Sequence, residues 1–236
     1  MLAPAADRPM RDSLRALAAL LAYPDAGLRE HLPEMRAALA AEDAVPLPRR
    51  AELEALMEAL QRSDPIETEA AYVELFDRGR STSLYLFEHV HGDSRDRGPA
   101  MVDLCRTYES AGLYLAPTQL PDYLPVVLEF ASTQPARAAR EFLAEIGHIL
   151  NALFGALGKR QSAYASVMGA LIELSGAKAQ PVEPAAEEEL DESWAEPPVF
   201  DGCSAKGQAK PGQAQPIHVV RPARTADANP RSGAAS

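Results

Sequence analysis

Apolar residues recur with helical spacing along most of the chain. In the first such stretch, Leu14, Leu17, Ala18 and Leu21 follow an i, i+3, i+4, i+7 pattern, which places them on one stripe of a helix. Pro24 ends this stretch, because proline lacks the N–H that a helix interior needs. The pattern therefore predicts an amphipathic helix that packs by one face against a core.

Helical spacing continues as far as residue 174, interrupted by proline and glycine. We predict helices over residues 28–41, 49–62, 65–76, 101–115, 136–157 and 161–174, a helix that begins at Pro121, and a short helix within residues 84–90. Pro125 would lie in the second turn of the helix from Pro121, so we expect a bend there.

The clearest predicted helix start lies at Asp64. Its carboxylate can accept hydrogen bonds from the first turn, Pro65 occupies the first helical position, and Glu67 follows at the position of a capping box. The apolar face of this helix should run from Ile66 to Phe76.

Composition supports helices over strands. The hydrophobic share of 47% is enough for a substantial core, yet aromatic residues make up only 6%, and alanine and leucine dominate. We therefore predict an all-α fold, a single helical-bundle domain of about eight to nine helices.

The C-terminal region differs in composition. Eight of the 20 prolines lie beyond Gly176, and residues 181–201 contain eight acidic residues and no Lys or Arg. This composition predicts a helical domain over residues 1–176 and a disordered acidic, proline-rich tail over residues 177–236. Trp194 lies in an apolar island of this tail, so a featureless tail and a short binding motif at residues 190–200 remain alternatives.

Charge and cysteine usage exclude several classes of protein. The net charge of -11 opposes binding to nucleic acid. Cys105 and Cys203 lie far apart and in no zinc-binding spacing, which suits the reducing cytoplasm. No apolar run approaches the roughly 20 residues that span a bilayer, so we expect no direct membrane insertion.

Residues 87–97 contain an unusual density of titratable side chains. His89, His91 and Asp93 could ligate a metal ion and support a metal-dependent hydrolase. Residues two apart point to different sides of a helix, however, and no strand is predicted here to mount the pair. The alternative is a structural role, in which Asp93, Arg95 and their neighbours form ion pairs with one another and cap helix ends.

A second cluster lies within residues 120–130. If the helix from Pro121 continues past Pro125, Asp122 and Glu129 are two turns apart on one face, with Tyr123 and Phe130 beside them. Carboxylates alternating with rings suit a peptide that carries basic and apolar side chains. Core packing is the alternative for the two rings, and a favourable first-turn position is the alternative for Asp122.

At these clusters the chain resembles the NarJ-type nitrate reductase assembly chaperones, within the wider TorD-like group of redox-enzyme maturation proteins. The resemblance runs through residues 72–80, 83–98 and 120–130 and covers about residues 10–176 as a helical unit. Asp122-Tyr123-Leu124 stands where the wider group tends to carry Asp-His-Leu. The segment at 194–200 is similar to the C-terminal extension of the family.

The resemblance implies a cytoplasmic chaperone, with no catalytic activity and no cofactor of its own. It would hold the catalytic subunit of a respiratory nitrate reductase by its N-terminal segment while the molybdenum cofactor enters, and proteins of molybdenum cofactor biosynthesis would be further partners. The same resemblance leaves other clients open, such as a dimethyl sulfoxide reductase or a formate dehydrogenase.

The resemblance also assigns roles to residues, as hypotheses. Phe76, Phe87, Tyr123 and Phe130 would form apolar walls for the client peptide. Five carboxylates would bind arginines of the client: Asp77, Glu88, Asp93, Asp122 and Glu129. Arg95, in the same polar run as Glu88 and Asp93, would also contact the client peptide. His89 and His91 would adjust binding with pH or orient the loop.

Overall fold

The computed structural model describes residues 9–92 and 94–179, and these form an all-α fold. Within this part of the chain there are ten α-helices and one short 3-10 helix, slightly more than predicted, and no strand. Asp93 and the predictions for the tail, including the motif around Trp194, lie outside the described residues.

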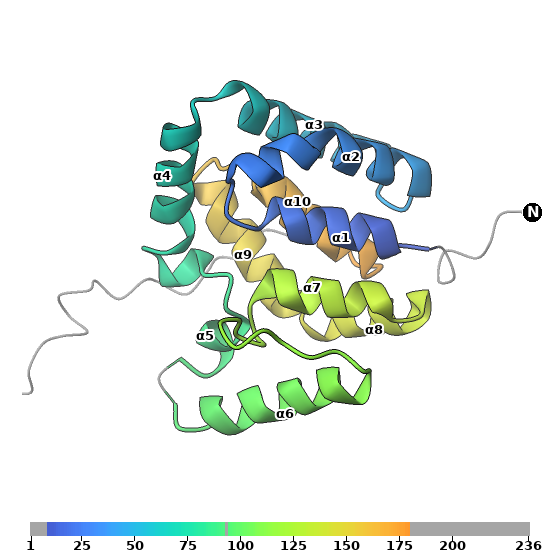
Figure 1. Ribbon diagram of the computed structural model, residues 1–236, viewed down its shortest axis with the longest axis vertical. Helices are drawn as coiled ribbons and strands as arrows, with labels where there is room; N and C mark the ends of the chain where they lie inside the picture. The colour runs from blue at the N-terminus through green and yellow to red at the C-terminus, as the bar shows by residue number, and fades with distance from the viewer. Residues whose placement is uncertain (1–8, 93, 180–236) are drawn as a thin grey trace, which may run out of the picture. The chain divides into compact units, whose positions relative to one another are not determined.

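The helices follow one another with short connections (Figure 1). In chain order they are α1 (Arg11–Leu20), α2 (Ala26–Glu42), α3 (Leu47–Arg62), α4 (Pro65–Phe76), the 3-10 helix η2 (Arg80–Thr82), α5 (Leu86–Val90), α6 (Arg97–Ser110), α7 (Leu124–Thr133), α8 (Ala136–Glu145), α9 (Gly147–Lys159) and α10 (Ala165–Leu174).

Helix α1 lies at the centre of the bundle. It packs against α7, α2 and α10, and Figure 1 shows it between the α2–α3 pair and α7. Leu14, Leu17 and Leu21 are 0% exposed and Ala18 is 2% exposed, so the predicted stripe is confirmed; Leu20, which was not part of it, is also 0% exposed. Burying four leucines completely is worth several kcal/mol, at about 1.5–3 kcal/mol for each side chain.

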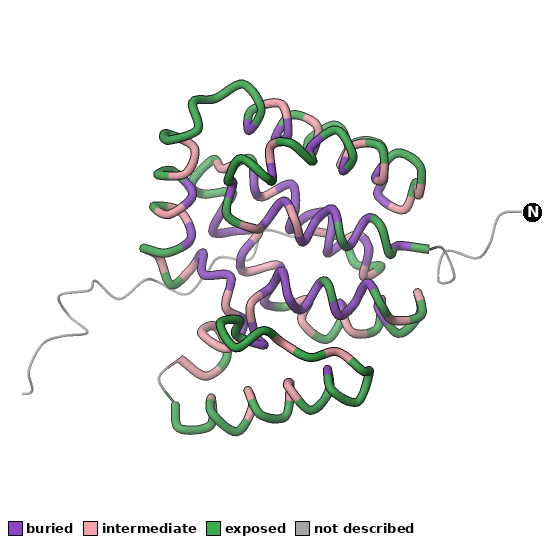
Figure 2. The backbone as a smooth tube through the Cα atoms, in the orientation of Figure 1, coloured by how far each residue is buried: buried purple, intermediate pink, exposed green. Residues whose placement is uncertain are grey.

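A second, smaller apolar cluster lies between α6 and α7. Tyr108, Val126 and Phe130 form its buried part, and the rings of Tyr108 and Phe130 are 4.8 Å apart. Tyr108 is the only buried residue of α6, and Figure 2 shows that helix as almost entirely exposed or half-buried. The small cluster therefore attaches α6 to the bundle near one end.

Helix α7 begins later than predicted. It starts at Leu124, so Pro125 lies in the first turn, where its missing N–H leaves no hydrogen bond unmade and causes no bend. The prediction that Asp122 and Glu129 share a helix face is wrong, because Asp122 precedes the helix.

Other boundaries also differ from the predictions. The single helix expected over 136–157 is divided at Ile146 into α8 and α9, where Gly147, a poor helix former, follows the break. Helix α6 ends at Ser110 because Gly112, with φ of 78°, leaves the helical region. The stripe predicted to continue along this helix to residue 115 therefore stops two turns earlier.

The predicted start of α4 is confirmed, whereas its predicted face is confirmed only at its end, where Phe76 is buried. Asp64 accepts hydrogen bonds from the N–H groups of Ile66 and Glu67. Ile66 itself is 78% exposed, and the residues of α4 that enter the core are Tyr72 and Phe76. No helix in the described ranges is long and apolar enough to cross a membrane.

Candidate functional site

The segment before α7 holds the short helix α5 in place. The Leu86 N–H donates to the Asp122 carbonyl at 2.9 Å, and the Leu124 N–H donates to the Leu84 carbonyl at 2.8 Å. Tyr85 and Tyr123 form an isolated antiparallel bridge between them, with their rings 5.3 Å apart. Two predicted clusters, distant in sequence, are therefore joined by main-chain hydrogen bonds.

The carboxylate of Asp122 caps α5 from outside the helix. Its Oδ2 accepts the Phe87 N–H at 3.1 Å, an amide that has no partner within so short a helix. The residue is 0% exposed, and its Oδ1 accepts no hydrogen bond from the described residues. Burial raises the pKa of the Asp122 carboxyl, although the Phe87 N–H and the Arg97 guanidinium act in the opposite direction.

Arg97, the first residue of α6, lies beside two carboxylates. Its Nη2 is 3.6 Å from Glu88 Oε1 and 3.9 Å from Asp122 Oδ2. These separations are too long for hydrogen bonds, so the arginine acts on both groups by charge alone. About 29% of its side chain remains exposed.

The two predicted histidines have different surroundings. Nε2 of His89 lies 2.8 Å from the carbonyl oxygen of buried Ser83, and since a carbonyl only accepts, His89 carries the proton on Nε2 and donates it. His91 packs its ring against Phe87, with centroids 5.3 Å apart. His89 therefore orders the loop before α5. Within residues 9–92 and 94–179, no group of three or more His, Cys, Asp or Glu side chains could hold a metal ion.

Tyr123 and Phe76 belong to the edge and the interior of the main core. The Tyr72 hydroxyl donates to the Leu21 carbonyl at 2.6 Å and accepts from the Tyr123 hydroxyl at 3.3 Å. Phe76 is 5% exposed and packs against the rings of Tyr72 and Tyr164. Phe76 is thus a core residue and cannot form a wall of a surface groove in this fold.

A pocket of about 390 Å³ lies over the small apolar cluster. Tyr108, Val126 and Phe130 form its floor, and exposed Glu129 of α7 lies at its rim. Arg11 and Arg15, one turn apart on α1, line the same pocket, together with Leu113, Tyr114, Leu115, Gln119, Ser132 and Thr133. This pocket combines apolar surface with charges of both signs.

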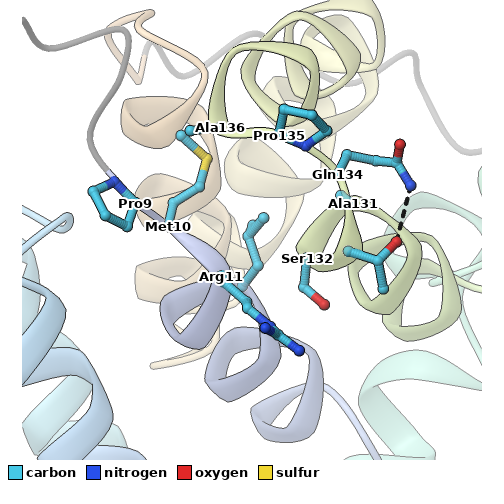
Figure 3. A pocket seen from close by; sticks show the side chains of 10 residues that line it. Pro9, Met10, Arg11, Ala131, Ser132, Gln134, Pro135 and Ala136 are labelled. Atoms are coloured by element: carbon cyan, nitrogen blue, oxygen red, sulfur yellow. Dashed lines mark hydrogen bonds between the residues drawn. The ribbon is translucent and has the colours of Figure 1, made fainter.

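A second hollow of about 490 Å³ continues along the α1–α7 seam (Figure 3). It lies between the start of α1 and the α7–α8 corner, where Gln134 Nε2 donates to Thr133 Oγ1 at 2.9 Å. The two hollows share Arg11, Ser132 and Thr133, so an elongated partner could contact both.

The structure separates the predicted site residues into four groups. Two are buried (Phe76 and Asp122), two line the pocket at α7 (Glu129 and Phe130), five are half-buried in or beside α5 (Phe87, Glu88, His89, His91 and Tyr123), and two are exposed in connecting segments (Asp77 and Arg95). Sequence reasoning missed Arg11, Arg15 and Tyr108 as neighbours of Glu129 and Phe130, and it placed Arg97 in the 87–97 cluster without its proximity to Asp122. The spacing of Arg11 and Arg15 put both on one helix face, but nothing local showed that α7 lies beside it.

The family model of the nitrate reductase delta subunit matches residues 21–168, which is more than half of the chain. The chain belongs to this family. All of the predicted site residues lie within the part that matches the delta subunit family.

Several named proteins match this chain over much of the same region. The nitrate reductase molybdenum cofactor assembly chaperone NarJ of Escherichia coli (strain K12) is 47% identical over 156 residues, and the match spans 66% of each chain, slightly under two thirds. A probable chaperone of the same description, NarW, from that organism is 42% identical over 69% of this chain and 68% of its own length. The resemblance inferred from the motifs is therefore confirmed.

Two further matches have lower sequence identity. A probable NarJ of Bacillus subtilis (strain 168) is 33% identical over 66% of this chain and 84% of its own length. The crystal structure of a candidate redox enzyme maturation protein from Archaeoglobus fulgidus aligns with a TM-score of 0.49 and 20% identity, covering 70% of this chain and 92% of that one.

Proposed function

We propose that this protein is an assembly chaperone of a respiratory nitrate reductase. It binds the catalytic subunit before the molybdenum cofactor is inserted, grips the N-terminal segment of that subunit, and acts in the cytoplasm before the enzyme attaches to the membrane. Membership of the delta subunit family supports the proposal, as do relatives that are named molybdenum cofactor assembly chaperones.

One structural observation carries the binding part of the proposal: the pocket over the small cluster joins a floor of rings to exposed charges. An amphipathic client helix could bury its apolar face on exposed Tyr114 and half-buried Leu113, which line the pocket above the buried rings, while a basic residue meets Glu129. Arg11 and Arg15 on the opposite wall suit the carbonyl end of the same helix, where the helix dipole is negative. The two walls would thus set the direction in which the client lies.

The surroundings of α5 complete the proposed surface. Glu88, Asp77 and the half-buried ring of Phe87 remain available to a client, whereas Asp122 and Phe76 support this surface from the interior. Met101, Leu104 and Cys105 form a half-buried stripe on α6 that offers further apolar contact. Asp93, outside the described residues, remains a predicted member of the surface.

The proposal is tested by titrating the full chain with a synthetic peptide of the first residues of the reductase catalytic subunit. Glu129→Lys should weaken binding roughly three- to tenfold, because it replaces an attractive charge at the pocket rim by a repulsive one. Glu145→Lys makes the same charge change at an exposed site outside both pockets and should leave affinity unchanged. Equal affinity of the two variants would exclude this pocket as the binding site.

Substituting the corresponding peptides of a dimethyl sulfoxide reductase and a formate dehydrogenase tests the choice of client. The nitrate reductase peptide should bind most tightly. Tighter binding of another peptide would assign the chain to that molybdoenzyme instead. Proteins of molybdenum cofactor biosynthesis, proposed here as further partners, can be sought in the same complexes by co-purification from cells respiring nitrate.

A further inference from the structure

Arg97 occupies a slot between two carboxylates, but binds neither of them closely. By slot we mean the space that the guanidinium fills between Glu88 on α5 and the buried Asp122, from whose nearest oxygens its Nη2 lies 3.6 and 3.9 Å. An arginine that fits a carboxylate normally makes bidentate bonds at about 2.7–2.9 Å. Arg97 therefore has the positive charge that suits the two carboxylates, but its distances from them are too long for hydrogen bonds.

Asp122 is the group in this slot that is least well satisfied. It is 0% exposed, yet Oδ1 has no hydrogen-bond partner among the described residues, and Oδ2 is bonded only to the Phe87 N–H. A buried carboxylate in this state gains from any donor that approaches more closely than Arg97 does. The slot is open to solvent along the arginine side chain, since Arg97 and Glu88 are 29% and 28% exposed.

Helix α6 is attached to the bundle at its two ends. Arg97 forms the attachment at the start, and near the end Tyr108 is buried and donates its hydroxyl hydrogen to the Pro121 carbonyl at 2.8 Å. Between them, Met101, Leu104 and Cys105 lie on the same helix face and are only half-buried. Loss of the Arg97 attachment would free the first half of α6 and uncover this stripe.

We propose that Arg97 is an internal placeholder in a guanidinium site formed by Glu88 and Asp122, and that an arginine of the client peptide displaces it. The displaced Arg97 releases the start of α6, whose apolar stripe then packs against the client. This inference rests on the proposed function. It adds that Glu88 and Asp122 form a subsite for one client arginine, and that Arg97 competes with that arginine for the subsite.

Such competition lowers the affinity of the free protein for its client, because Arg97 must leave before the client arginine enters. Removing the charge of Arg97 should therefore tighten binding, although it removes an attractive contact from the free protein. A residue with a purely structural role would give the opposite result or none.

The test compares Arg97→Gln with the matched variant Arg106→Gln, which alters an exposed arginine of α6 that pairs with Asp103 of the same helix. The full-length proteins are titrated with the N-terminal peptide of the reductase catalytic subunit and with versions in which each arginine is replaced by neutral citrulline. Arg97→Gln should bind the unmodified peptide roughly two- to fivefold more tightly than the wild type, the range expected for a partly exposed ion pair. Arg106→Gln should bind like the wild type.

One citrulline replacement should remove most of the gain produced by Arg97→Gln, and that position identifies the arginine that enters the slot. Hydrogen exchange of the free proteins gives a second measurement: amides in the first half of α6 should exchange faster in Arg97→Gln than in the wild type or in Arg106→Gln. Unchanged or weaker peptide binding by Arg97→Gln, with no change in exchange at α6, overturns the placeholder. Absence of peptide binding by all variants contradicts the proposed function itself.

Discussion

Helices α1 and α6 have similar apolar stripes in sequence but different environments in the fold. Six of the ten residues of α1 are buried, whereas only Tyr108 is buried in the fourteen residues of α6. The difference arises because α1 has helices on several sides, while the described residues place against α6 the small cluster around Phe130 near its end and the carboxylates of Glu88 and Asp122 at its start. An apolar stripe in the sequence therefore predicts that a helix face is buried. It does not predict whether the same chain or a partner buries it.

The two regions also differ in the interactions that stabilise them. The bundle around α1 is stabilised by apolar burial, which is lost only by unfolding. The α5–α6 region has less apolar burial, and it relies in addition on single polar contacts: Asp122 with the Phe87 N–H, the Tyr108 hydroxyl with the Pro121 carbonyl, and the ion pairs at Arg97 that are too long for hydrogen bonds. Contacts of this kind can be exchanged for contacts with a client at little cost.

The largest expected contrast follows from truncating one leucine in each region. Leu17→Ala, in a site that is 0% exposed, should lower the free energy of unfolding by about 2–5 kcal/mol through lost burial and a new cavity. Leu104→Ala on the half-buried stripe of α6 should cost less than about 1 kcal/mol, since little surface is uncovered. Urea denaturation followed by circular dichroism measures both, and equal losses would mean that α6 is packed as firmly as α1.

Removal of the external cap of α5 should have an intermediate effect. Asp122→Ala leaves the Phe87 N–H without an acceptor and should lower the free energy of unfolding by about 1–3 kcal/mol. Asp122→Asn keeps an oxygen in place and is the matched control, with a smaller loss or none. If both variants are as stable as the wild type, the hydrogen bond to Phe87 contributes nothing to the fold.

The smallest expected effect is a dependence on pH. Because burial raises the pKa of Asp122 in the folded protein above its value of 3.8 in model compounds, the protonated form is favoured by folding. Protonated Asp122 therefore stabilises the fold fully at pH values below the pKa that this carboxyl has in the unfolded chain. The stabilisation is lost as the pH rises through the pKa that the carboxyl has in the folded protein. The unfolding free energy of Asp122→Asn, minus that of the wild type, should thus increase between about pH 4 and neutrality.

Denaturant titrations of the two proteins at several pH values measure this difference. Salt should be held constant throughout, because the neighbouring Arg97 and Glu88 charges are partly exposed and therefore screened. A difference that stays level, or that falls with rising pH, would show that the buried carboxyl is better solvated than its surroundings indicate.

Local sequence was sufficient for several elements of the site. The cap at Asp64 depends on residues within one turn of each other, and the short helix at 84–90 was predicted from its apolar composition. The charged residues at 87–97 follow directly on Leu84 and Leu86, which the structure joins to Leu124 and Asp122 by main-chain hydrogen bonds. Prediction failed where a boundary depended on a single proline or glycine, as at Pro125 and Gly147.

The sequence by itself determined the all-α class, the central stripe of α1 and the membership of the family, because helix periodicity and motif identity are local properties. Only the tertiary structure decided that Asp122 is buried while Glu129 is exposed, and that Arg97 lies over a carboxylate far away in the chain. Burial and charge pairing depend on which segments meet, and that is settled by the packing of the whole bundle.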